Sequence, residues 1–209
     1  MSSVRLALVD VHKRFNRRMI FQKIGVDIAG PGSVAIVGRN GSGKSTLAKI
    51  IAGVLAPTSG SVRLEVEGRE VPREERYRYL GFVSPYLMLY DEFTAAENVS
   101  MLEAMRTGVT PSASAVAELL DSMGLSGRRN DRVGTFSSGM KQRVKYAVAL
   151  VHRPPLLILD EPTANLDLDG VAIVKEVVRA QKTSGILLLA TNDQEEADWC
   201  GARIDLGKG

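Results

Sequence analysis

The feature that most constrains this chain is the segment Gly38–Ser45, which fits the pattern G-x-x-x-x-G-K-[ST]. A short run that is typical of a buried strand, Ser33–Val37, precedes it, and apolar residues at helical spacing follow it over Leu47–Leu55. Glycines let backbone N–H groups approach a phosphate chain closely, and the N-terminus of the following helix attracts anions. Strand, loop and helix in this order therefore predict a nucleoside triphosphate site, which leaves GTPases, kinases and motor ATPases open.

The polar residues of this loop have predicted roles. Lys44 is expected to reach the β- and γ-phosphates, and the Ser45 hydroxyl is expected to bind Mg²⁺. The residues predicted to bind the nucleotide here are Gly38, Arg39, Asn40, Gly41, Ser42, Gly43, Lys44, Ser45 and Thr46.

Composition excludes several other classes of protein. The 27 basic and 24 acidic residues give a net charge of +3, too small to indicate nucleic acid as the main partner. The single cysteine, Cys200, cannot form an internal disulfide and suits a reducing, cytoplasmic compartment. The longest apolar runs have about five residues, whereas a membrane span needs about 20.

Short buried runs alternate with helical patterns along the chain, which predicts an α/β fold with a mainly parallel sheet covered on both faces. Strands are expected at Val4–Val9, Ser33–Val37, Leu156–Leu159 and Ile186–Ala190, with strand, turn and strand over Ser61–Leu80. Helices are expected at Ala95–Met105, Ser112–Met123, Ser138–Val151 and Val171–Gln181. We therefore expect one domain over residues 1–209. Its P-loop core comprises residues 1–94 and 136–209, with an antiparallel β portion near the N-terminus and an inserted α-helical lobe at about residues 95–135.

Two acids end the expected strand Leu156–Leu159. Asp160 is placed to hold Mg²⁺, directly or through water, and Glu161 to polarise the attacking water as a general base. A helix-capping acid after the strand is the alternative, which the phosphate loop upstream makes the weaker interpretation.

The segment Phe136–Arg143 precedes the long expected helix and narrows the class. With the phosphate loop and the acidic strand end, it resembles the ATP-binding subunits of ABC transporters, which carry an L-S-G-G-Q signature before the aspartate strand. Here Phe136 replaces the leucine, Ser138 the first glycine and Met140 the glutamine. The resemblance covers about residues 4–207.

The resemblance implies a head-to-tail dimer that sandwiches two ATP molecules. Ser137, Ser138 and Gly139 would then offer hydroxyl and N–H groups to the γ-phosphate bound by the other copy, although a plain N-cap is the alternative for the serines. Asp167 would belong to the loop that links the two sites. Phe15 would stack on adenine, unless it is simply part of the core.

Two positions depart from the family pattern. Pro85 stands where a glutamine is usual, and Ser84 is a weak substitute; Asn192 stands where a histidine contacts the γ-phosphate. Asparagine can donate a hydrogen bond but cannot carry a positive charge. Asn192 is therefore expected to contribute to catalysis, and the enzyme to be a slow ATPase.

Aromatic residues gather between positions 77 and 93, where six of the chain's 11 lie. In the family this region binds a helix of the integral membrane subunit, so we expect that subunit to dock near Tyr86–Tyr90. The alternative is that these side chains only pack within the chain's own core.

The resemblance thus predicts an ATP-hydrolysing transporter subunit that uses ATP and Mg²⁺. Its expected partners are a second copy, or a related ATPase subunit, and a membrane subunit that holds it on the cytoplasmic face of the cell membrane; no nucleic acid is expected. The alternatives are a soluble, non-transport ABC ATPase and a slow nucleotide-sensing subunit. The transported substrate and the direction of transport are not encoded in these motifs.

Overall fold

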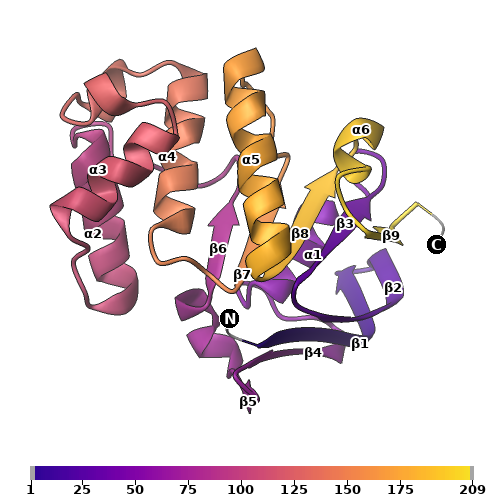
Figure 1. Ribbon diagram of the computed structural model, residues 1–209. Coiled ribbons are helices and arrows are strands. Elements are labelled where there is room, and N and C mark those ends of the chain that lie inside the picture. The colour runs from indigo at the N-terminus through magenta and orange to yellow at the C-terminus, as the bar shows by residue number, and fades with distance from the viewer. Residues whose placement is uncertain (1–2, 208–209) are drawn as a thin grey trace.

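The computed structural model describes residues 3–207, which form two sheets and the helices that cover them (Figure 1). The first sheet is antiparallel, in the order β2-β1-β4-β5. Its strands are β1 (Val4–Phe15), β2 (Arg18–Ala29), β4 (Ser59–Val66) and β5 (Arg69–Glu70). The second sheet is parallel, in the order β6-β7-β8-β3-β9. Its strands are β6 (Leu80–Val83), β7 (Leu156–Asp160), β8 (Ile186–Thr191), β3 (Gly32–Val37) and β9 (Ala202–Asp205).

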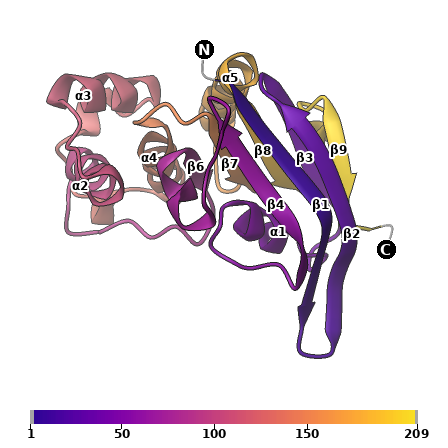
Figure 2. The ribbon, with the colours of Figure 1, turned by 90° about the horizontal axis from the view of Figure 1, so that it is seen from below.

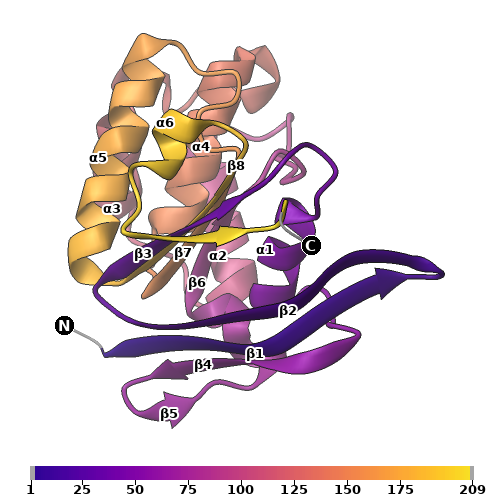
Figure 3. The same cartoon turned by 90° about the vertical axis from the view of Figure 1, so that its right-hand side faces the viewer.

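Six α-helices accompany the two sheets within the described residues. They are α1 (Lys44–Ile51), α2 (Ala95–Thr107), α3 (Ala113–Ser122), α4 (Ser138–Leu150), α5 (Leu168–Ser184) and α6 (Gln194–Ala197). Three short 3₁₀ helices accompany them: η1 (Arg73–Arg78), η2 (Ser126–Arg128) and η3 (Val133–Thr135). Figures 2 and 3 show α1 between the two sheets. The expected α/β fold, with a mainly parallel sheet and an N-terminal antiparallel portion, is confirmed.

The central strands read as continuous apolar runs because both of their faces are covered. Leu156 and Ile158 of β7 pack into a core with α1 and the antiparallel sheet. Leu157 and Leu159, which point to the opposite face, pack with α4 and α5. The parallel sheet is thereby fixed between two cores, and its strand ends form a rigid edge for a site.

Helices α2 and α3 lie outside the sheet, on the far side of α4 from α5 (Figure 1). A capping box at Thr94 and Glu97 starts α2, and Gly108 ends it in the left-handed region. The core continues from the sheet through α4 into these helices, as with Val144 and Val99. The residue bounds of the expected lobe stay a prediction, and residues 1–2 and 208–209 of the expected core lie outside the described residues.

The structure contains further elements that were not expected, among them β6, β9 and α6. Strand β2 was not expected; its alternation is broken where Lys23 adopts a φ of 54°, and the register with β1 shifts on either side. The strand, turn and strand expected over Ser61–Leu80 are present as β4 and the short β5, but the second strand ends at Glu70. The chain before Leu80 forms η1 instead, in which Arg76 turns inward and donates to the carbonyl oxygens of Ile51 and Val62. No helix within residues 3–207 is long and apolar enough to cross a membrane.

Candidate functional site

The glycine-rich loop joins β3 to α1 at the carboxyl edge of the parallel sheet. Its backbone requires glycine at two positions. A Cβ on Gly38 would lie 2.5 Å from the Ser42 Oγ, and a Cβ on Gly43 would lie 2.4 Å from Cγ2 of Ile20 in β2. Both glycines also have positive φ, of 155° and 103°. The loop is thus held tightly against its own side chains and the antiparallel sheet.

Hydrogen-bond donors of Lys44 and of the α1 backbone lie at this loop. The buried Lys44 folds back so that its Nζ donates to the carbonyl oxygens of Gly38, at 3.0 Å, and Arg39, at 3.3 Å. The N-cap of α1 is Gly43, and no side chain caps the helix there. The first N–H groups of α1 are consequently left for a ligand, and an anion suits them.

Asp160 ends β7 beside the start of α1. The Ser45 hydroxyl donates to the Asp160 Oδ1 at 3.0 Å, whereas the buried Oδ2 has no hydrogen-bond partner within residues 3–207. Burial raises the pKa of this carboxyl, and the Ser45 hydrogen bond opposes the rise. A hydroxyl and an unpartnered carboxylate oxygen are hard ligands of the kind that Mg²⁺ takes. The residues present therefore fit the metal ion that the sequence predicts.

Glu161 follows directly and is exposed, with a φ of 53° that its backbone hydrogen bond to the Ala190 carbonyl oxygen supports at 2.9 Å. It opens on a cavity of about 340 Å³. The cavity is lined by Arg18, Ile20, Asn40, Gly41, Gly43, Lys44, Ser45, Thr46, Tyr86 and Glu161. The structure thus brings the expected general base together with the lysine and hydroxyls of the loop. No sequence motif predicts a nucleotide-site role for Arg18, Ile20 or Tyr86, because tertiary packing brings them to this cavity.

Asn192 follows β8 and lies at the other end of the loop. Its Nδ2 donates to the Asn40 Oδ1 at 3.0 Å, and it lines a neighbouring cavity of about 570 Å³ with Gly38 and Arg39. Close by, the hydroxyls of Thr163 and Thr191 both donate to the buried carboxylate of Glu196. Glu196 links the segment after β7 to the end of β8 and was not predicted, because no motif in the sequence distinguishes it from its acidic neighbours Asp193 and Glu195.

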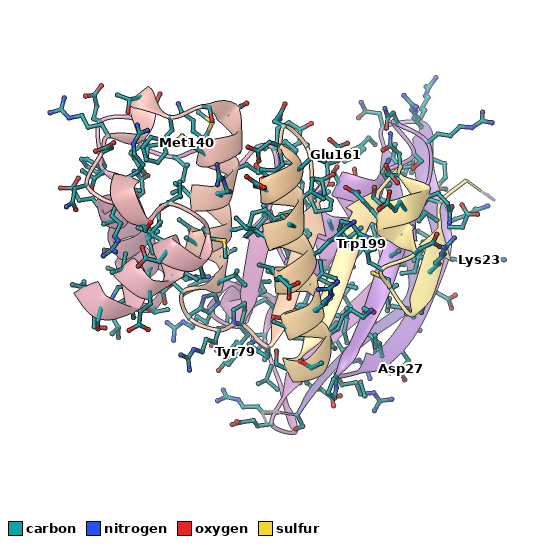
Figure 4. All side chains as sticks on the ribbon, turned by 45° about the horizontal axis from the view of Figure 1, so that its top comes forward. Lys23, Asp27, Tyr79, Met140, Glu161 and Trp199 are labelled. Carbon is teal, nitrogen blue, oxygen red and sulfur yellow. The ribbon has the colours of Figure 1, made fainter. Side chains whose placement is uncertain are left out.

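The signature residues lie apart from Lys44. Ser137 caps α4, where its Oγ accepts from the Met140 N–H at 3.2 Å. Ser138 is exposed and lines a separate cavity of about 280 Å³ with Pro85 and Asn165. Figure 4 shows Met140, in α4, and Glu161 at the same end of the molecule, on either side of α5.

Three other expected residues complete the comparison with the sequence. A Cβ on Gly139 would lie 3.0 Å from the Asn165 carbonyl oxygen, which places this glycine against the loop before α5. Asp167 caps α5 by accepting from the Gly170 N–H at 2.9 Å. Phe15 is 45% exposed at the turn between β1 and β2, with the Lys13 Nζ 4.7 Å from its ring centroid. It does not line the cavity that holds Lys44.

Known proteins resemble this chain in sequence and fold. The family model described as ABC transporter matches residues 21–164. The lipoprotein-releasing system ATP-binding protein LolD of Acinetobacter baylyi is 36% identical, covering 94% of this chain and 92% of that protein. The lantibiotic transport ATP-binding protein SrtF of Streptococcus pyogenes is 35% identical, covering 90% and 79%.

Solved structures of ABC ATP-binding proteins have a similar fold. An ATP-binding subunit of an ABC transporter superposes with a TM-score of 0.83 at 28% identity, covering 97% of this chain and 85% of that one. The fold also matches the ATP-binding cassette MJ0796, a dimer bound to ADP and Pi in a post-hydrolysis state, with a TM-score of 0.84 at 24% identity, covering 97% and 94%.

Proposed function

The chain belongs to the ABC transporter family as an ATP-binding, ATP-hydrolysing subunit, and from this premise we propose that two copies close head to tail around two MgATP and drive a membrane partner. One observation supports the head-to-tail dimer most strongly: Lys44 and Ser138 line different cavities of one chain. Each chain would then supply one half of each of the two reaction centres.

One half of each centre would bind the phosphates and activate the attacking water. Lys44 and the free N–H groups of α1 would bind the β- and γ-phosphates, and Ser45 and Asp160 would hold Mg²⁺. When bound, the metal ion neutralises charge on the phosphates. Glu161 would take a proton from water as the water oxygen attacks the γ-phosphorus, and the bond to the bridging oxygen breaks to release ADP.

The other half closes the centre. Ser138 and the start of α4 would face the γ-phosphate held by the partner copy. Leu168, next to the Asp167 cap, is 88% exposed, which favours a surface that a second copy covers.

The test of the dimer uses the Glu161→Gln variant, which removes the base but keeps the shape of the site. Light scattering after size exclusion should show a dimer with MgATP and a monomer without it. The double variant with Lys44→Ala should stay monomeric under both conditions. A monomeric Glu161→Gln protein at saturating MgATP would contradict the proposal.

A membrane subunit is the proposed partner of the segment Leu87–Tyr90. Met88 is 79% exposed and Tyr90 is 47% exposed, and an apolar helix would cover such side chains. This partner would hold the chain on the cytoplasmic face of the membrane. Met88→Ser with Tyr90→Ala should reduce the share of the protein that sediments with membranes from its own cells, whereas Tyr77→Ala, exposed elsewhere, should not. An unchanged share in the double variant would contradict docking here.

Hydrolysis is favoured over a purely nucleotide-sensing role by Glu161. It lines the same cavity as Lys44 and Ser45, which is the place a general base needs. Turnover should be measurable in the parent protein and lost in Glu161→Gln, and equal rates in the two would favour the sensing role.

A further inference from the structure

The loop after β6 carries one polar side chain into the nucleotide cavity. Tyr86 lines this cavity with Lys44, Ser45 and Glu161, although its place in the sequence predicts membrane docking. The neighbouring residues supply nothing comparable: Pro85 has no side-chain donor, and Ser84 is only 4% exposed. Tyr86 is therefore the residue of this loop that a bound nucleotide would meet.

Several contacts fix the position of Tyr86. Its N–H donates to the Ser84 Oγ at 3.3 Å, and the Nζ of Lys145, from α4, donates to the Pro85 carbonyl oxygen at 3.2 Å. The Lys49 Nζ lies 4.5 Å from the centroid of the Tyr86 ring. Because Lys49 lies on α1, one turn after Ser45, this cation–π contact holds the ring beside the phosphate loop.

The hydroxyl of Tyr86 is open to a ligand, because the side chain is 70% exposed. A phenolic hydroxyl is a good donor to a charged phosphate oxygen. Ser45 and Glu161 share the cavity, and they are the residues proposed to hold Mg²⁺ and to activate the attacking water. The terminal phosphate would therefore lie at this end of the site.

We propose that Tyr86 is a further residue of the nucleotide site, whose hydroxyl donates a hydrogen bond to the terminal phosphate of bound ATP. The assignment rests on the proposed function, because it needs the phosphates to lie along Gly38–Ser45. It makes the contact specific for ATP over ADP, since ADP lacks the phosphate group that Tyr86 would bind. Pro85, a residue with fixed φ, then serves to limit the freedom of the loop that presents the hydroxyl.

The test removes the hydroxyl alone. Tyr86→Phe keeps the ring that Lys49 contacts, and Tyr77→Phe is the matched control, because Tyr77 is 43% exposed and has Arg78 at 5.6 Å from its ring centroid. Two quantities are measured on the full chain: kcat for MgATP, and the calorimetric affinities for MgATP and MgADP in a Glu161→Gln background, where hydrolysis does not interfere.

The expected result is a kcat lowered about tenfold in Tyr86→Phe, the size expected for one hydrogen bond to a charged group. The affinity for MgATP should fall severalfold and that for MgADP should not change; Tyr77→Phe should match the parent throughout. A Tyr86→Phe protein with the parent's kcat and the parent's preference for MgATP over MgADP would overturn the assignment while leaving the proposed function intact. A parent that binds neither nucleotide would overturn both.

Discussion

The Ser45 hydroxyl and the Asp160 carboxylate meet through a hydrogen bond of 3.0 Å, although 115 positions separate them in the chain. The strand order β7-β8-β3 produces this meeting, because the carboxyl ends of parallel strands lie at one edge of the sheet. The second oxygen of Asp160 stays buried without a partner within residues 3–207. This arrangement is costly without a ligand and well suited to one that carries positive charge.

Asp160 should therefore lower the stability of the nucleotide-free protein while being required for its ATPase activity. Burial raises its pKa, so its charged form destabilises the nucleotide-free fold at pH values above that pKa. Asp160→Asn should leave the melting temperature without nucleotide unchanged or higher, yet lower kcat about 100-fold or more. Asp121→Asn, which alters an exposed ion pair with Arg129, is the control and should keep the parent's rate. A destabilised Asp160→Asn protein with normal turnover would contradict this view.

Asn192 should limit the rate of hydrolysis. Its amide donates to Asn40 and can carry no positive charge, so it stabilises developing phosphate charge less than a protonated side chain would. Asn192→His should raise kcat severalfold in steady-state assays. Gln194→His adds a histidine to the rim of the same cavity and should have no such effect. Parent turnover equal to or above that of Asn192→His would remove the hypothesis of a slow ATPase.

His152 should make the fold sensitive to acid. Burial and the Arg106 guanidinium, whose Nη1 lies 3.1 Å from the His152 Nε2, lower the pKa of His152 to about 4. The unfolded chain keeps the ordinary pKa of about 6.5 and binds the proton first. The free energy of unfolding should therefore fall as the pH drops from 6.5 toward 4, by roughly 2 kcal/mol from this group.

Denaturant titrations across this pH range check the effect. His152→Gln keeps an acceptor for Arg106 but takes up no proton, so its stability should depend less steeply on pH than that of the parent. Identical slopes in the two proteins would show that His152 is not the responsible group.

The phosphate loop and the pair Asp160–Glu161 were predictable because each is a local pattern with a strand beside it. Strand β2 was not, since the positive φ of Lys23 breaks the alternation on which strand prediction depends. Tyr86 and Glu196 were assigned no such role because their importance comes from tertiary contacts. Tyr86 shares its cavity with Lys44 and Glu161, and Glu196 accepts from Thr163 as well as from the nearby Thr191, so contacts between distant parts of the chain give both residues their place.

Each reaction centre is proposed to draw residues from two copies. Lys44→Ala removes the phosphate-binding charge from one half, and Ser138→Asp places a negative charge, at an exposed position, on the other half. Each variant alone should have almost no ATPase activity. In a mixed dimer one centre carries both changes and the other carries neither.

The ATPase rate of the two purified variants, mixed in equal amounts, therefore tests the shared centre. We expect a rate well above the sum of the two separate rates. A mixed rate equal to that sum, with mixed dimers demonstrated by differential tags, would contradict it.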